Sequence, residues 1–110
     1  MKKLRVLATL VVVMLTAEIG RISFNGHEET YYNLNMSNIV NRAHENGIDG
    51  AYWIDGDGVK RFDKYVIVAA DWGLHPYGSL VETSRGLGIV LDTGDFIKEH
   101  PANIDIAVAW

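Results

Sequence analysis

Short apolar segments separated by turn residues recur along most of this chain. The dipeptide Asn25-Gly26 favours a hairpin turn, and Asp55-Gly56-Asp57-Gly58 consists entirely of residues common in turns. The chain holds 11 glycines and only 2 prolines. Strands are predicted around these turns, at residues 21–24, 27–34, 51–54, 59–62, 65–70, 79–83, 88–91 and 104–110. Many short strands with glycine-rich turns indicate a mainly β protein and are typical of a small barrel.

One segment, residues 35–47, has helical periodicity. Its apolar residues fall on one face at helical spacing: Met36, Ile39, Val40 and Ala43. Asn35 or Ser37 is expected to cap the first turn, and Gly47 stands where a left-handed C-terminal cap belongs. The sequence therefore predicts one short amphipathic helix that packs against the strands.

The first 17 residues differ in character from the rest of the chain. Lys2, Lys3 and Arg5 precede an apolar run, residues 6–17, that ends at a small residue, Ala17. This order is typical of a secretory signal peptide, and the run is shorter than the about 20 apolar residues of a membrane span. We expect residues 1–17 to form a signal peptide or short anchor, with a buried strand as the alternative. Residues 18–110 are then a single domain.

This N-terminal segment also predicts where the protein acts. A signal peptide or short anchor places the protein outside the cell membrane, at the cell wall or cell surface. Contact with a membrane is expected only through the N-terminal segment, if that segment is not cleaved. The residues predict no particular oligomeric state.

Charge and composition restrict the class of ligand. The chain has 10 basic and 14 acidic residues, whereas a nucleic-acid binder needs a basic stripe, so no nucleic-acid partner is expected. The absence of cysteine excludes disulfides and thiolate chemistry. The four histidines lack a paired metal-ligand spacing, and Asp55 and Asp57 are better explained as turn residues than as calcium ligands. No metal or organic cofactor is predicted.

Three aspartates stand at or beside the ends of apolar segments in the C-terminal half. Asp71 and Asp92 each follow an apolar run, and Asp105 is flanked by two isoleucines. Apolar flanks place a carboxyl near the core, where it must be hydrogen-bonded, paired or protonated. Thr93 and Gly94 add a hydroxyl and an open backbone amide beside Asp92. We expect the three carboxyls to meet at one end of a barrel, with Asp92 as the working residue.

The order of these motifs resembles the Asp-Asp-Asp (3D) domain family. An apolar strand ending in Asp71 is followed by Pro76-Tyr77-Gly78-Ser79, then by a strand with Asp92-Thr93-Gly94, then by Ile104-Asp105-Ile106. The resemblance covers residues 64–110, and Tyr31-Tyr32 matches an aromatic residue of the family's first strand. The family usually has a second glycine after Asp-Thr-Gly, where this chain has Asp95.

The resemblance implies a six-stranded double-psi-type β-barrel with one short helix, related to the barrel of membrane-bound lytic transglycosylase A and, more distantly, to rare lipoprotein A. It implies a lytic transglycosylase-like enzyme that acts on peptidoglycan glycan strands. Asp92 is then the catalytic acid, and Asp71 and Asp105 either take part in catalysis or hold the loops. The residues expected to bind substrate are Thr93, Gly94, Trp72, Tyr32 and His75.

The implied reaction needs one carboxyl in two roles. Asp92 would protonate the glycosidic oxygen and then accept the proton of the muramoyl 6-hydroxyl, which closes a 1,6-anhydro ring. Ordinary glycosidases instead divide these roles between two carboxyls. This mechanism requires a protonated carboxyl at the start, which a poorly solvated site with neighbouring acids favours.

Other interpretations of the same residues remain open. The main alternative is a non-catalytic module of the same fold that binds wall glycan or a protein partner, and a structural wall-associated protein is a third. Retroviral-type aspartic proteases also carry Asp-Thr-Gly, but near the front of the chain rather than at residues 92–94 of 110. Trp53 and Trp110 are expected in the core, whereas Trp72 is as well placed to stack on a sugar ring.

Overall fold

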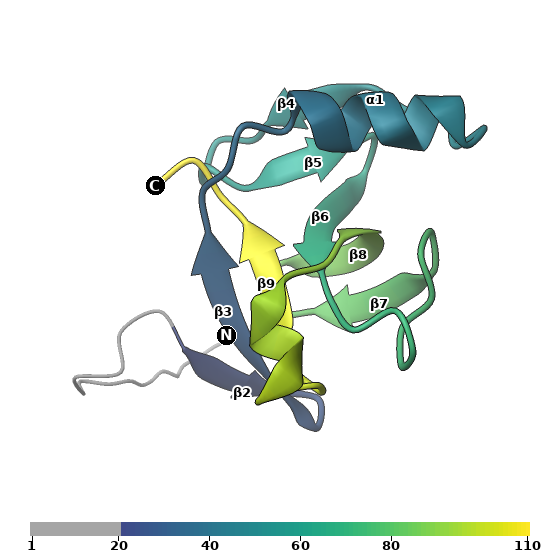
Figure 1. Ribbon diagram of the computed structural model, residues 1–110. Coiled ribbons are helices and arrows are strands. Elements are labelled where there is room, and N and C mark those ends of the chain that lie inside the picture. Colours follow the sequence, from purple (N-terminus) through teal and green to yellow (C-terminus); the bar gives the residue numbers. More distant parts are fainter. Residues whose placement is uncertain (1–20) are drawn as a thin grey trace.

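The computed structural model describes residues 21–110, so the predicted signal peptide or anchor at residues 1–17 lies outside the described part. The described chain is mainly β, with one short α-helix and one 3-10 helix, as Figure 1 shows. This confirms the prediction of a mainly β protein with one short α-helix. Eight strands form one mixed sheet, whereas the family resemblance implied a six-stranded barrel. Backbone hydrogen bonds within residues 21–110 do not close the sheet into a barrel.

The sheet combines parallel and antiparallel pairs. Its strands are β2 (Ile22–Phe24), β3 (His27–Tyr32), β4 (Tyr52–Ile54), β5 (Lys60–Phe62), β6 (Tyr65–Ala69), β7 (Leu80–Thr83), β8 (Gly86–Asp92) and β9 (Ile104–Ala107). The main path through the sheet runs β2-β3-β9-β6-β5-β4, and β8 joins β6 to β7. The β3/β9 and β6/β8 pairs are parallel, and the other strand pairs are antiparallel.

Strand β6 is hydrogen-bonded along both of its edges. One edge pairs with β8 from Val66 to Ala69. The other edge is divided between β5, which pairs with Tyr65 and Val66, and β9, which pairs with Val68 and Ala69. Residues 66–70 are buried, which explains why this segment is apolar throughout rather than alternating.

Apolar clusters cover both faces of the sheet. The first cluster packs α1 (Ser37–Glu45) against the strands and contains Met36, Ile39, Ala43, Phe62, Ile67, Ile89, Leu91 and Ala107. The second lies on the opposite face and contains Val59, Val66, Val68, Ala70, Val90, Ile104, Ile106 and Val108. Figure 1 shows α1 lying over β4 and β5, at the opposite end of the molecule from β2.

The helix forms where the sequence predicts it, with a shorter extent. Its predicted apolar face is buried, with Val40 only partly covered. The expected cap by Asn35 or Ser37 is not formed, because Met36 occupies the N-cap position without a side-chain cap hydrogen bond. Asn35, just before it, accepts a hydrogen bond from the Ser37 backbone amide at 2.9 Å. Gly47 has φ +82°, as predicted for a left-handed residue at the C-terminal end.

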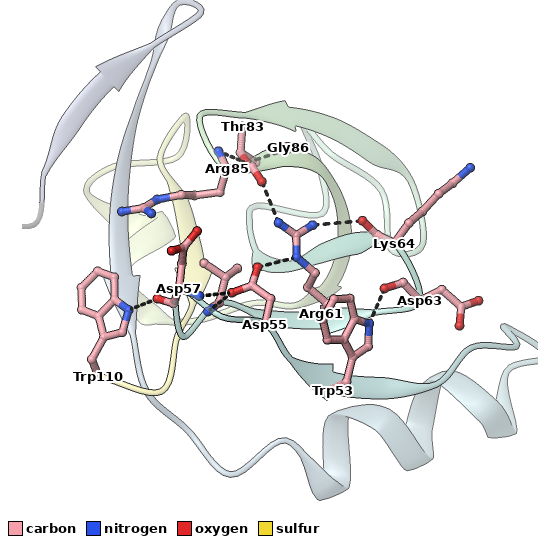
Figure 2. Close-up of polar contacts among 11 residues, drawn as sticks. Trp53, Asp55, Asp57, Arg61, Asp63, Lys64, Thr83, Arg85, Gly86 and Trp110 are labelled. Atoms are coloured by element: carbon pink, nitrogen blue, oxygen red, sulfur yellow. Dashed lines mark hydrogen bonds and ion pairs between the residues drawn. The ribbon is translucent and has the colours of Figure 1, made fainter. Parts of the chain in front are cut away.

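The predicted turns are confirmed at both hairpins. Asn25 and Gly26 both have positive φ and join β2 to β3, as a type I′ turn requires. In the β4–β5 turn, the Asp55 carboxylate accepts hydrogen bonds from the amides of Asp57 and Val59 and from Arg61 Nε at 2.7 Å. Figure 2 shows that Asp55 is thereby engaged within its own hairpin.

Side chains connect the β3 side of the sheet to the β7–β8 hairpin. Glu29 on β3 is fully buried, and its carboxylate accepts hydrogen bonds from the backbone amide and hydroxyl of Ser84 at 2.8 and 2.6 Å. The Arg85 guanidinium lies 5.6 Å from the ring centre of Tyr31 on β3. Within residues 21–110, these side-chain contacts connect β3 to the β7–β8 hairpin, and no backbone hydrogen bonds pair β3 with β7 or β8.

The packing of Phe62 against Gly50 provides a test of the first cluster. A Cβ on Gly50 would lie 2.3 Å from the Phe62 ring, and Phe62 is only 1% exposed, so the ring has little room to move. We predict that Gly50→Ala lowers the free energy of unfolding by about 1–3 kcal/mol, measured by urea denaturation. Gly56→Ala is the control because a Cβ there meets nothing within 4 Å. Equal stability of the two variants would contradict this packing.

Candidate functional site

Two of the predicted aspartates lie in one row across the sheet. Ala69 on β6 pairs with Asp92 on β8 along one edge and with Asp105 on β9 along the other. Asp105 pairs in turn with Thr30 on β3. Paired residues on neighbouring strands project to the same face of a sheet. The carboxyls of Asp92 and Asp105 therefore flank the methyl group of Ala69 on one face.

Asp92 is held by two hydrogen-bond donors. The Tyr32 hydroxyl donates to Asp92 Oδ2 at 2.9 Å, and the Thr93 backbone amide donates to Oδ1 at 2.9 Å. Burial, the Asp92 charge and hydrogen bond, and the Asp105 charge together raise the pKa of Tyr32 well above its usual value. Tyr32 thus remains a donor at neutral pH, and the two donors hold the Asp92 carboxyl in place.

Asp105 has a different environment from Asp92. Its Oδ1 accepts a hydrogen bond from the Thr30 hydroxyl at 2.9 Å, and Thr30 accepts one from Asn103 Nδ2 at 2.9 Å. Burial raises the pKa of Asp105, and the nearby Asp92 charge raises it further, against the lowering effects of Thr30 and Arg21. The two carboxyls therefore have different hydrogen-bond partners: the Tyr32 hydroxyl and the Thr93 amide for Asp92, and the Thr30 hydroxyl for Asp105.

The Asp71 carboxyl is engaged in its own loop. Its Oδ1 accepts a hydrogen bond from the Gly73 amide at 2.7 Å, and its backbone carbonyl accepts from Leu74 and His75 at 3.0 and 2.7 Å. This is the arrangement of an Asx-type turn, in which a side chain replaces a backbone acceptor. Within residues 21–110, the structure gives this carboxyl no contact with the carboxyls of Asp92 or Asp105. Asp71 thus orders the loop after β6.

Trp72 lies next to Asp92. Its indole Nε1 donates to the Asp92 backbone carbonyl at 3.0 Å, and its ring packs edge-on against Tyr77 with the ring centres 5.1 Å apart. The residue is 37% exposed, so part of the ring faces solvent beside the carboxyl pair. His75 is half-buried in the same loop. The position of Trp72 suits contact with a molecule that approaches Asp92.

The residues after Asp92 form the opening of a short 3-10 helix, η1 (Asp95–Lys98). Thr93 is exposed and Gly94 is half-buried with extended backbone. A Cβ on Gly94 would lie 3.1 Å from the Phe96 ring, which leaves little room for a side chain. Asp95 is exposed at the first position of η1, where a carboxylate interacts favourably with the helix amides.

Two residues of this site were not predicted from the sequence. They are Thr30, which the pairing of β3 with β9 places opposite Asp105, and Ala69, which β6 places between Asp92 and Asp105. Thr30 stands two residues before Tyr32 on the same strand, so strand alternation places them on one face. That alternation was the available signal for Thr30, once Tyr32 had been singled out.

The expectation that Trp53 and Trp110 lie in the core is wrong. They are 46% and 57% exposed. Figure 2 shows each indole Nε1 donating to a backbone carbonyl, Trp53 to Asp63 at 2.6 Å and Trp110 to Asp57 at 3.0 Å. Each ring thus lies on the surface with its polar edge satisfied, an arrangement that hydrophobicity alone does not predict.

No protein-family model, curated protein or solved structure matches this chain. Within residues 21–110, no group of three or more His, Cys, Asp or Glu side chains is arranged to hold a metal ion. The same part of the chain contains no helix that is both long and apolar enough to cross a membrane.

The environment of Asp105 predicts a pH-dependent effect on stability. Its pKa in the folded protein is raised above the ordinary value of 3.8, so its favourable contribution is present below that value and is lost as pH rises through the folded pKa. Asp105→Asn, which cannot ionise, should therefore be more stable than the wild type at neutral pH. The gain should shrink as the solution is acidified towards pH 3.8.

Urea denaturation across this pH range measures the effect. Asp49→Asn is the matched control because Asp49 is an exposed loop residue, and it should show no such gain. A destabilised Asp105→Asn protein at neutral pH would mean that hydrogen bonding to the charged carboxylate outweighs its burial.

Proposed function

We propose that this protein cleaves the glycan strands of peptidoglycan without water, as a lytic transglycosylase-like enzyme. The observation that carries the proposal is the carboxyl pair on one face of the sheet, in which Asp92 is held by two donors and the pKa of Asp105 is raised. Cleavage of a glycosidic bond needs a proton donor and a proton acceptor near the same atom. Two neighbouring carboxyls in unlike environments meet that need.

In the proposed reaction the carboxyl pair begins with one proton, and Asp92 is the member that transfers it. The pair gives its proton to the glycosidic oxygen as the bond from that oxygen to the anomeric carbon breaks. The muramoyl 6-hydroxyl then bonds to the anomeric carbon and closes the 1,6-anhydro ring, and its proton returns to the pair. Because one proton leaves and one returns, the enzyme ends in its starting state. The Tyr32 hydroxyl keeps Asp92 in position throughout.

The same proposal assigns the remaining predicted residues to substrate binding. Trp72, partly exposed beside Asp92, would stack on a sugar ring, and exposed Thr93 would offer its hydroxyl. Gly94 and His75 would line the approach. The action on wall glycan implies export to the cell wall or surface, which residues 1–17 would direct.

The proposal also covers the type of β fold. We propose that the sheet is an opened form of the double-psi type of barrel. The two parallel pairs, β3/β9 and β6/β8, support this assignment because simple antiparallel meanders contain none. The side-chain bridge from Glu29 to Ser84 supports it as well, since it joins the regions that a barrel would bring together.

One observation favours a second candidate, a non-catalytic module that binds wall glycan or a protein partner. The Asp71 carboxyl closes its own loop, and that loop presents the Trp72–Tyr77 ring pair partly to solvent. Exposed aromatic rings on an ordered loop bind sugars without chemistry. The two candidates differ in whether the carboxyl pair is needed for anything beyond binding.

Incubation with purified sacculi, followed by mass spectrometry of the released products, tests the proposal. The wild type should release fragments with 1,6-anhydro-muramoyl ends. Asp92→Asn removes the acid–base group with little change in shape and should lower the rate by about 10²–10⁴-fold while sedimentation with sacculi persists. Asp49→Asn, the exposed control, should retain the wild-type rate.

Other outcomes would overturn parts of the proposal. Reducing ends in place of anhydro ends would show that water attacks, and the reaction would be hydrolysis. Binding to sacculi with no released fragment would establish the binding module. Equal activity of wild type and Asp92→Asn would remove Asp92 from the chemistry.

A further inference from the structure

A pocket of about 550 Å³ lies beside the N-terminal end of α1, and none of the residues proposed for glycan cleavage lines it. Six of its lining residues matter here: Asn35, Met36, Asn41, Tyr52, Ile54 and Lys60. Its volume is within the range that binds small organic molecules. It is formed between the start of the helix and the hairpin of β4 and β5.

Among residues 21–110, Lys60 is the one cationic residue that lines this pocket, and it is 5% exposed. Its Nζ donates to Asn33 Oδ1 and to the Leu34 backbone carbonyl, both at 2.7 Å. An ammonium group has three donors, and both of these acceptors are neutral. No carboxylate within residues 21–110 forms an ion pair with Lys60.

A buried cation without a counter-charge is unfavourable. Burial lowers the pKa of Lys60, as expected where no anion offsets the loss of water. The first turn of α1, which also borders the pocket, contains no acidic residue. Its positive dipole end adds to the Lys60 charge rather than opposing it. The described part of the chain supplies no anionic side chain to this pocket, so an anionic ligand would complement its charge.

The walls of the pocket are apolar on the hairpin side. Ile54 pairs with Lys60 and Tyr52 pairs with Phe62, so these side chains share the face on which α1 packs. Tyr52 and Ile54 lie on β4 at the end of the main path of the sheet and are 38% and 47% exposed. A ligand that filled the pocket would cover both while its anionic group reached Lys60.

We propose that this pocket binds a carboxylate carried on a small aliphatic body. Lys60 supplies the charge and the third N–H donor, and Tyr52 and Ile54 cover the aliphatic part. A carboxylate suits one ammonium because a single oxygen accepts the available hydrogen bond. Such a group occurs at the end of a peptide and in a simple carboxylic acid. This proposal does not depend on the glycan-cleaving activity.

Titration of the whole protein followed by NMR tests the proposal with three probes. They are 4-methylpentanoate, its uncharged analogue 4-methylpentanamide, and N-acetyl-leucine. The two carboxylates should shift the resonances of Lys60, Tyr52 and Ile54 in a saturable way. The amide should bind at least about tenfold more weakly, because it lacks the charge that Lys60 would meet. Tighter binding of N-acetyl-leucine would identify a peptide end as the source, and tighter binding of 4-methylpentanoate a simple acid.

Two pairs of variants locate the site. Lys60→Met should weaken carboxylate binding about tenfold or more, whereas Lys64→Met, an exposed lysine on the next turn, should not. Asn41→Asp places a negative charge at the pocket on an exposed helix position and should also weaken binding without disturbing the core. Asn46→Asp adds the same charge at the far end of α1 and is its control.

Three results would overturn the proposal. They are equal affinity for acid and amide, shifts that map away from the pocket, and no binding at the solubility limit of the probes. If Lys60→Met fails to fold, the Asn41→Asp and Asn46→Asp pair decides. Equal affinity of those two variants would then contradict the site.

Discussion

Pairing along both edges of β6 is the constraint on which the candidate site depends. The register of that pairing shifts between Val68 and Ala69: Val68 pairs with Val90, whereas Ala69 pairs with Asp92. Leu91 is therefore the extra residue, which keeps its apolar side chain in the first cluster and brings Asp92 into line with Ala69. On the other edge, β9 aligns Asp105 with the same alanine. One short strand thus fixes both carboxyls.

The electrostatics of the site follow from this alignment. The charge of Asp92 raises the pKa of the neighbouring Asp105 carboxyl. The surroundings of the two groups also differ, because Tyr32 and Thr93 donate to Asp92, whereas burial raises the pKa of Asp105. The buried second cluster beneath the strands gives β6, β8 and β9 little freedom to separate the two groups. A fixed pair of carboxyls in unlike surroundings is the physical basis of the function proposed for this chain.

Local sequence patterns were enough to predict the elements and to single out Asp92, Asp105 and Tyr32, but not the strand register that brings them together. Asn25-Gly26, the apolar run of β6 and the amphipathic helix all form as predicted, because each depends on neighbours in sequence. The row through Ala69 depends on pairing between strands far apart in the chain, which no local pattern encodes. The Asp71 side chain was grouped with Asp92 and Asp105 by its place after an apolar strand. Its hydrogen bond to Gly73 shows that local turn chemistry determines its orientation instead.

The central claim, that Asp92 and Asp105 act on each other across Ala69, is tested most directly by NMR titration of the Asp105 side-chain carboxyl carbon. In the wild type the midpoint should lie above the ordinary value of 3.8. In Asp92→Asn the midpoint should fall, because the neighbouring charge that raises the Asp105 pKa has been removed. The same midpoint in both proteins would show that the two carboxyls do not interact and would contradict the account.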